Sequence, residues 1–486
     1  MVYNEKKTKK QGVDYIMSLP SRLRNFFIPR CMVKPELVCG PIPPTKEIYT
    51  TAFRIAWPST LEAVLVGLVG VIDTIMVSAL GAGAIAAVGL TNQPKMIVLA
   101  IIMSLNVSVT AIVARRKGAM QRMDANQCLR FSMLLSAVIS LLFGFAGFSF
   151  ARPMMRFAGA GDDILDMATT YFRIIMLGTI FNGLSMTINA AQRGAGNTKI
   201  SMVTNLAANF VNMIFNYLLI GGNLGFPRLG IAGAALATVI GSMVSLAIAV
   251  GSLLYHDGFL TLRMRCRWLM DKFSLGSMFS ITTSALVEQV FMRIGFFTYA
   301  KIIAGLGTDA FATHQIAMNA MSMSFTFGDG LQVACASLVG QELGAKRPDL
   351  SIIYGKVGNR IAMCISSVLC VVFVTCAQPI MRLFTDQTHI IQAGVPLLYI
   401  TAVVTFAQTS QVVFSGCLRG AGDTRFVAMV SFISIMFVRP VLSYLLCYPL
   451  GLGLLGAWIG IIIDQYTRLG FTLFRFSTGK WTKIAV

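Results

Sequence analysis

Residues 193–199 read Arg-Gly-Ala-Gly-Asn-Thr-Lys, and residues 419–425 read Arg-Gly-Ala-Gly-Asp-Thr-Arg, the same loop 226 positions later. The register also holds far from this loop, since Glu62 falls on Glu288 without a gap. Chance does not maintain one register over so long a stretch. The chain is therefore predicted to be an internal duplication, and this decides its architecture.

Apolar segments surround both copies of the loop. Hydrophobic residues make up 56% of the 486 positions and charged residues only 12%, about half the share typical of a soluble domain. Segments of roughly 20 apolar residues recur, the length that a helix needs to cross about 30 Å of hydrocarbon. The predicted spans are 48–79, 84–112, 126–150, 162–190, 197–222, 231–255, 274–305, 310–339, 353–377, 388–417, 424–450 and 453–477.

The fold predicted from these spans is an all-α polytopic membrane protein of twelve transmembrane helices. The repeat covers six spans, an even number, so both halves enter the membrane in the same direction as a parallel repeat. The predicted units are a basic tail (1–47), a first lobe (48–255), an inter-lobe loop (256–273), a second lobe (274–477) and a short C-terminus (478–486). The tail, rich in proline, is expected to be a flexible arm beside the membrane.

The net charge of +20 is distributed unevenly. With a cytoplasmic amino terminus, 26 Lys and Arg residues lie in the tails and loops on the cytoplasmic side, and about five lie in loops on the other side. This bias predicts that both termini are cytoplasmic. It assigns the basic excess to topology and to contact with anionic lipid, so no nucleic-acid partner is expected.

The first half carries the most informative polar groups, because each ionisable group at membrane depth costs at least about 2.5–3.5 kcal/mol. Glu62 and Asp73 are eleven residues apart on the first span, which places both on one face of the helix, about 16 Å apart. Four amides of the fifth span share one face through spacings of 4, 3 and 4: Asn205, Asn209, Asn212 and Asn216. Their counterparts in the second half are almost wholly apolar. Helix packing explains such a ladder in part, but its confinement to one half favours a site for a monovalent cation or a proton.

The second half offers a different set. Glu288 repeats Glu62, whereas Tyr299 replaces the second acid, and Glu288 lies near Arg293, with which it could form a structural ion pair. Without an amide ladder beside it, Glu288 is expected to be an unpaired carboxylate that faces substrate. His314 is more often a satisfied polar group than a proton relay, and Arg439 is a candidate partner for an acid across the cleft.

The paired loops resemble those of the multidrug and toxic compound extrusion (MATE) family, as do Val71-Ile72-Asp73-Thr74 and Val339-Gly340-Gln341. The resemblance covers roughly residues 48–481. It implies a bacterial transporter of the inner (plasma) membrane, with two six-helix lobes in a V around a central cleft. It also implies antiport, in which mostly cationic, apolar organic compounds such as drugs and toxins leave in exchange for sodium ions or protons.

The resemblance also suggests functional residues. It implies a cation-coupling site, with Na⁺ as the candidate metal ion, at Asp73, Asn212, Asn216 and Thr238, where family members usually have aspartate in place of Asn216. In the second lobe it implies a substrate or coupling role for Glu288, and Gln408 stands where some members have a further aspartate. The coupling ion would be the only cofactor, and a monomer is expected.

Two alternatives remain from the sequence. One is a flippase for lipid-linked saccharides, from the same superfamily, which would line its cleft with several Arg and Lys residues. The other is a membrane-embedded enzyme such as a polyprenyl-phosphate transferase, which would need a cluster of acids or histidines. The sequence has no metalloprotease, nucleophile-elbow or Walker motif, which argues against an enzyme.

Overall fold

The computed structural model describes residues 28–255, 258–264 and 270–484. Its long helices follow the predicted spans closely. They are α3 (Thr45–Ser78), α4 (Ala82–Gly118), α5 (Arg122–Ser149), α7 (Asp162–Gly194), α8 (Thr198–Gly221), α9 (Ile231–Tyr255), α10 (Lys272–Ala304), α11 (Thr308–Gly344), α12 (Pro348–Thr375), α14 (Thr388–Gly420) and α17 (Gly453–Ser477). The remaining span is α15 (Thr424–Ser431), a π-helical segment (Phe432–Val438) and α16 (Arg439–Cys447). Short elements complete the described chain: η1 (Pro29–Met32), η2 (Pro35–Leu37), α6 (Ala151–Phe157), η3 (Asn223–Gly225), α13 (Ala377–Arg382) and η5 (Lys480–Lys483).

The duplication is visible in the helix bounds. Three long helices of the first half, α4, α5 and α7, begin and end 226 residues before α11, α12 and α14. The connections repeat as well, since Gly81 and Gly307 precede α4 and α11 with similar positive φ angles of 99° and 105°. The chain therefore consists of two parallel six-helix repeats, as predicted.

Nine of the helices in the described chain are long and apolar enough to span a membrane by length and composition. The long helices α10, α11 and α17 do not meet that criterion, because they carry more polar and charged side chains. Two of these are buried inside the protein, Glu288 on α10 and Asp464 on α17. An ionised group within a bilayer is expected to face protein or water in this way.

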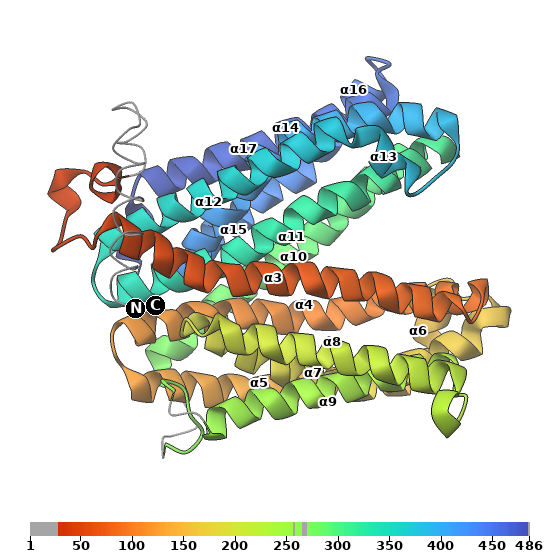
Figure 1. Cartoon of the computed structure of the whole chain (residues 1–486), viewed down its shortest axis with the longest axis horizontal. Helices are drawn as coiled ribbons and strands as arrows, with labels where there is room; N and C mark the ends of the chain where they lie inside the picture. The colour runs from red at the N-terminus through yellow and green to blue at the C-terminus, as the bar shows by residue number, and fades with distance from the viewer. Residues whose placement is uncertain (1–27, 256–257, 265–269, 485–486) are drawn as a thin grey trace, which may run out of the picture.

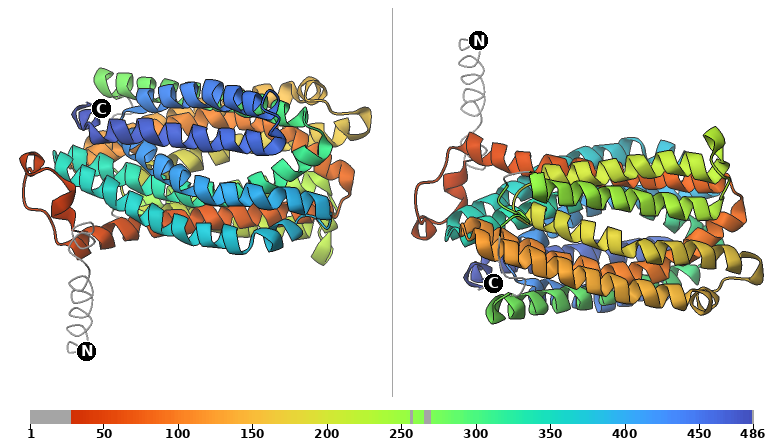
Figure 2. Two further views of the ribbon diagram at one scale, coloured as in Figure 1. Left: turned by 90° about the horizontal axis from the view of Figure 1, so that it is seen from above. Right: turned by 90° about the horizontal axis from the view of Figure 1, so that it is seen from below.

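The two repeats form two bundles that lie close together at the end carrying the chain termini and diverge toward α6, α13 and α16 (Figure 1). Viewed from opposite sides, the molecule presents the second repeat on one face and the first on the other (Figure 2). Between the bundles, α11 contacts both α3 and α4, and α10 contacts α4.

The closed end is built around a symmetric glycine crossing. A Cβ atom added to Gly118 would lie 1.7 Å from the backbone oxygen of Gln341, and one added to Gly344 would lie 2.0 Å from the backbone oxygen of Arg115. These four residues are two repeat-related pairs, so the contact lies on the pseudo-two-fold axis. Because side-chain carbons need about 3.5 Å from such atoms, the two backbones approach this closely only without side chains.

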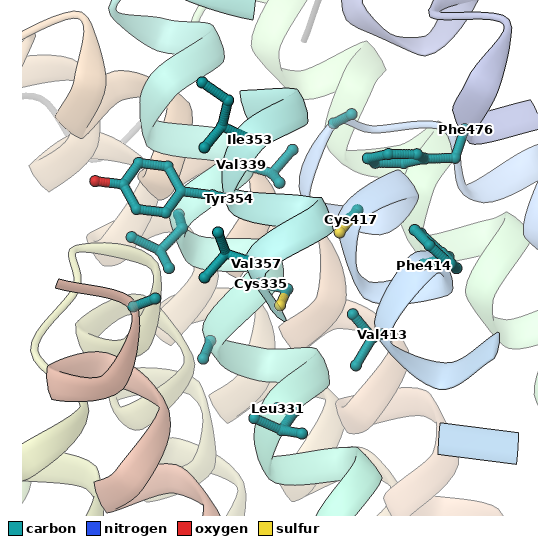
Figure 3. Packing of buried hydrophobic residues seen from close by; sticks show 14 of the residues in the cluster. Leu331, Cys335, Val339, Ile353, Tyr354, Val357, Val413, Phe414, Cys417 and Phe476 are labelled. Carbon is teal, nitrogen blue, oxygen red and sulfur yellow. The ribbon is translucent and has the colours of Figure 1, made fainter. Parts of the chain in front are cut away.

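The closed end also has its own apolar core. Buried side chains of α11, α12, α14 and α17 pack there, among them Leu331, Val357, Val413 and Phe476 (Figure 3). The same cluster includes Met32 from the tail and Ile48 from α3. The expectation of a flexible arm is therefore wrong for residues 28–44, which pack against the second repeat. Residues 1–27 lie outside the described part of the chain.

The second repeat departs from the first at its fifth span. In the first repeat this span is the regular helix α8, whereas in the second a π-helical segment precedes Arg439 and Pro440. Proline has no N–H for the helical ladder and crowds the preceding turn, which accounts for the irregular backbone.

Candidate functional site

A polar cavity of about 470 Å³ lies between the two repeats. Most of its lining comes from α3, α7, α8 and α9 of the first repeat, and α11 of the second closes one side. Its ionisable lining residues are Glu62, Asp73, Arg193 and Asp329. Three carboxylates against one guanidinium make this cavity acidic.

Asp73 forms hydrogen bonds with two of the other three residues of the predicted site. The amide nitrogen of Asn216 donates to Asp73 Oδ1 at 2.8 Å. The amide of Asn212 fits its surroundings when its nitrogen faces Asp73, donating to Oδ1 at 2.8 Å and Oδ2 at 3.1 Å, while its oxygen accepts from Thr238. The opposite orientation would point an amide oxygen at a carboxylate. The structure thus brings all four predicted residues together.

A second, smaller cavity of about 170 Å³ lies on the other side of Asp73. Asp73 and Thr238 line both cavities, while Asn216, Tyr171 and Asn92 line only the smaller one. The carboxylate therefore separates two solvent-sized spaces, from either of which a small cation can approach it.

Asp73 has charged and titratable neighbours that the sequence analysis missed. Lys95 on α4 is close enough for its charge to act on Asp73, and Tyr171 on α7 interacts with Thr238. Lys95 follows Pro94 inside an apolar run. An ionisable group at membrane depth calls for an explanation, and applying that rule to this position would have identified it.

Glu62 forms a second polar centre eleven residues earlier on α3. Its Oε1 accepts from the Asn205 amide at 2.5 Å and from the Ser201 hydroxyl at 3.2 Å, and lies 3.6 Å from Arg193 Nη1. Its Oε2 is buried and has no partner among the described residues. Asn205 therefore joins α8 to α3, as packing contacts do, whereas Glu62 Oε2 makes no such contact.

The same arrangement recurs in the second repeat. Arg419 Nη2 lies 2.8 Å from Glu288 Oε1, and the Ser431 hydroxyl donates to that oxygen at 2.9 Å. These three residues are the repeat mates of Arg193, Glu62 and Asn205. In each lobe, a Glu–Arg pair therefore links the first span to the fourth, and the same glutamate accepts a hydrogen bond from the fifth span.

Two predictions about Glu288 are wrong. It is not an unpaired carboxylate, and its partner is Arg419 from a distant span, whereas Arg293 is exposed. Only 4% of Glu288 is exposed, and it does not line the 470 Å³ cavity. Sequence proximity suggested Arg293, but the tertiary structure brings Arg419, near the end of α14, to the carboxylate in the middle of α10.

The other candidates of the second lobe gather away from the cavity. His314 packs edge-on against Tyr299 and Trp458, with ring centroids 5.5 and 5.8 Å apart, and the Arg439 guanidinium lies over the Tyr299 ring at 5.7 Å. Arg439 Nε donates to Asp464 at 3.0 Å, and so does Arg468. Arg439 therefore pairs within its own lobe, not across the cleft. Gln408 is fully buried, and its amide has no partner among the described residues.

Sequence reasoning also missed two amides on α7. Asn182 and Asn189 line the cavity together with Met186 and Arg193. Their interval of seven residues places the two amides on one face of the helix, so helical periodicity would have found them. Of the ladder itself, Asn205, Asn209 and Asn212 line the cavity.

The pairing of each glutamate leads to a testable difference between the repeat mates. We expect Glu62→Gln to weaken binding of a fluorescent organic-cation probe about tenfold, because a charge-assisted hydrogen bond inside the cavity contributes roughly 1.5–3 kcal/mol. Glu288→Gln, the matched control, should have a smaller effect on the affinity for the probe. Fluorescence titration of the purified variants, at matched protein amounts, measures both. A larger defect in Glu288→Gln would contradict this assignment.

The match to a known protein family also reflects the duplication, with one matched segment in each repeat. The MatE family model matches two segments, residues 58–218 and 285–445. The chain is 28% identical over 444 residues to "Probable multidrug resistance protein NorM" of Thermotoga maritima, covering 90% of this chain and 94% of that protein. It is 27% identical over 429 residues to "Uncharacterized transporter YisQ" of Bacillus subtilis, covering 87% and 92%.

The fold has close counterparts among solved structures. An outward-facing MATE family multidrug resistance transporter of the MOP superfamily superposes with a TM-score of 0.82 at 22% identity, covering 89% of this chain and 97% of that one. The twelve-helix, two-repeat arrangement is therefore that of a known transporter fold.

Proposed function

Because this chain belongs to the MatE family of membrane transporters, we propose that it is a secondary active antiporter that exports cationic, largely apolar organic compounds. The observation that supports this most is the acidic cavity between the lobes. Arg193 forms an ion pair with Glu62, so the charges of these two residues cancel. Asp73 and Asp329 then give the lining its net negative charge. Cavities of this size hold drug-sized ligands, and a low-dielectric wall strengthens the attraction of a cation.

The coupling ion in this proposal is one monovalent cation per cycle, a sodium ion or a proton, bound at Asp73. The carboxylate supplies the charge, and Asn212, Asn216 and Thr238 supply neutral oxygens or hydrogen-bond partners. Family members usually have a second acid at position 216, so this site has one negative charge fewer. The positive charge of the nearby Lys95 reduces the net negative charge further, so the site does not balance more than one bound cation.

The flippase alternative predicts a basic cavity, whereas the observed lining is acidic. A pyrophosphate-linked saccharide requires several basic residues in the cavity, but the 470 Å³ cavity has Arg193 alone, in an ion pair. Transport of a fluorescent organic cation against a fluorescent lipid-linked saccharide, in the same liposomes, decides between them. Movement of the saccharide alone would overturn the antiporter proposal.

We also propose that the protein lies in the plasma membrane with both termini in the cytoplasm, on the strength of the basic bias of the loops. With the native cysteines replaced by serine, a cysteine tag at either terminus should resist a membrane-impermeant maleimide added outside intact cells. A cysteine in place of Phe157, which is 96% exposed at the end of α6, is the positive control and should be labelled. Labelling of a terminal tag in intact cells would invert the topology.

A further inference from the structure

A groove of about 840 Å³ lies on the outer side of the second repeat, at the end of the molecule that carries the termini. Helices α12 and α17 both pack on α14, and the groove runs between them, with Phe414 of α14 at its floor. The tail segment that includes Met32, Val33, Lys34 and Leu37 covers one part of it. This groove is distinct from the central cavity, with which it shares no lining residue.

The charged lining residues of the groove are all basic: Lys34, Lys356 and Arg360. Lys356 Nζ donates to the Met32 carbonyl at 2.6 Å, which uses one of its three N–H bonds. Arg360 Nη1 lies 3.3 Å from both Met32 Sδ and the Tyr49 hydroxyl, so the tail holds both long side chains in place. The acid of the tail segment, Glu36, is exposed and does not line the groove.

The rest of the groove is apolar and exposed. Phe474 is 67% exposed, and Leu37 and Leu473 are 46% and 45% exposed. The floor is aromatic, because Phe414 packs against Phe476 with ring centroids 4.8 Å apart, and Phe476 stacks on Trp481. Figure 3 shows Phe414 and Phe476 close to each other at the edge of the core. A basic end beside exposed apolar side chains matches an amphiphile with an anionic head and hydrocarbon chains.

From this arrangement we propose that the groove is a binding site for an anionic glycerophospholipid of the leaflet on the side of the termini. The phosphate would lie between Lys34 and Lys356, with Arg360 reaching it from deeper in the groove, and the acyl chains would pack along Leu473 and Phe474. The sequence of the chain's first 27 residues is net basic, so its charge matches that of the groove and does not complement it. The proposal does not depend on what the central cavity transports.

The lipid would bridge the tail, α12 and α17, which already share one apolar core. Its head would contact the tail and α12, and its chains would contact α17. Because the tail also packs in the core shared by α3 and the second repeat, a bound lipid would stabilise the closed end of the molecule. Each basic residue beside an anionic membrane surface increases the affinity for that surface about fivefold.

The test uses the full chain, purified and delipidated in dodecyl maltoside, titrated with phosphatidylglycerol, phosphatidylcholine or inorganic phosphate. Thermal unfolding reports stabilisation, and native mass spectrometry reports retained lipid. Phosphatidylglycerol should raise the Tm and remain bound, while phosphatidylcholine and inorganic phosphate should do neither. Equal effects of the two lipids, or an equal effect of inorganic phosphate, would overturn the proposal.

Two variants with the same change of charge localise the effect. Lys34→Gln removes a basic side chain from the groove, and Lys46→Gln removes an exposed one outside it. Lys34→Gln should raise the phosphatidylglycerol concentration needed for half-maximal stabilisation about fivefold, and Lys46→Gln should leave it unchanged. Equal shifts in the two variants would indicate diffuse attraction of lipid and contradict a site. Neither substitution disturbs the anchored Lys356 and Arg360, so both variants are expected to fold.

Discussion

Gly118→Ala is expected to reduce transport at least tenfold while leaving the protein folded. The added carbon would lie 1.7 Å from the backbone of α11, so α4 and α11 would have to separate at the closed end. Overpacking of this kind costs about 1–3 kcal/mol. That cost falls only on conformations in which the lobes touch there, so the protein would favour the arrangement that is open at this end. An antiporter confined to one arrangement cannot complete its cycle.

Distances between spin labels on α4 and α11 near the closed end should increase in the variant, and transport in liposomes should fall. Gly344→Ala, at the repeat-related position, should reproduce both effects. Gly276→Ala is the matched control, because a Cβ there has no neighbour within 4 Å. Normal transport by both Gly118→Ala and Gly344→Ala would show that the glycine crossing is not required for closure.

Asp73→Asn should abolish gradient-driven export and leave substrate binding largely intact. The substitution keeps the shape of the side chain but removes the one negative charge among the four residues of the proposed coupling site. Neither a sodium ion nor a proton can then be exchanged at that position. Substrate would still meet Glu62 and Asp329 on the cavity wall.

Separate sodium and pH jumps in liposomes measure the coupling, and fluorescence titration of purified protein measures substrate binding. Asp163→Asn, at an exposed acid near the start of α7, controls for expression and handling. Retained gradient-dependent export by Asp73→Asn would remove Asp73 from the coupling site. The Asn212 and Asn216 amides would then be interhelical packing contacts, as Asn205 is.

Much of the architecture could be predicted from the sequence, because its causes are local or periodic. Apolar segments of bilayer length predict spans wherever they occur, and the repeated loops at 193–199 and 419–425 predict two parallel halves. The four residues of the proposed coupling site, which the family resemblance implied, are neighbours in the structure. Helical spacing by itself indicated only that Glu62 and Asp73 share one face of α3 and that the four asparagines share one face of α8.

The pairing of charges across helices was decided only by tertiary structure. Glu62 and Glu288 have the same position in the repeat, yet only Glu62 lines the 470 Å³ cavity. The reason is that different elements pack against the two lobes. Arg419 reaches Glu288 and Arg439 reaches Asp464 because spans distant in sequence come together in the bundle. No periodicity encodes such contacts.

The tail and the closed end show the same division. Proline and lysine in residues 28–44 indicate an irregular, basic segment, but its docking on α12 depends on a groove that exists only after the second repeat has folded. Likewise, Gly118 and Gly344 are recognisable as repeat mates in the sequence. Their role as the closest approach of the two lobes follows from the pseudo-two-fold axis, on which each glycine faces the backbone of the other repeat.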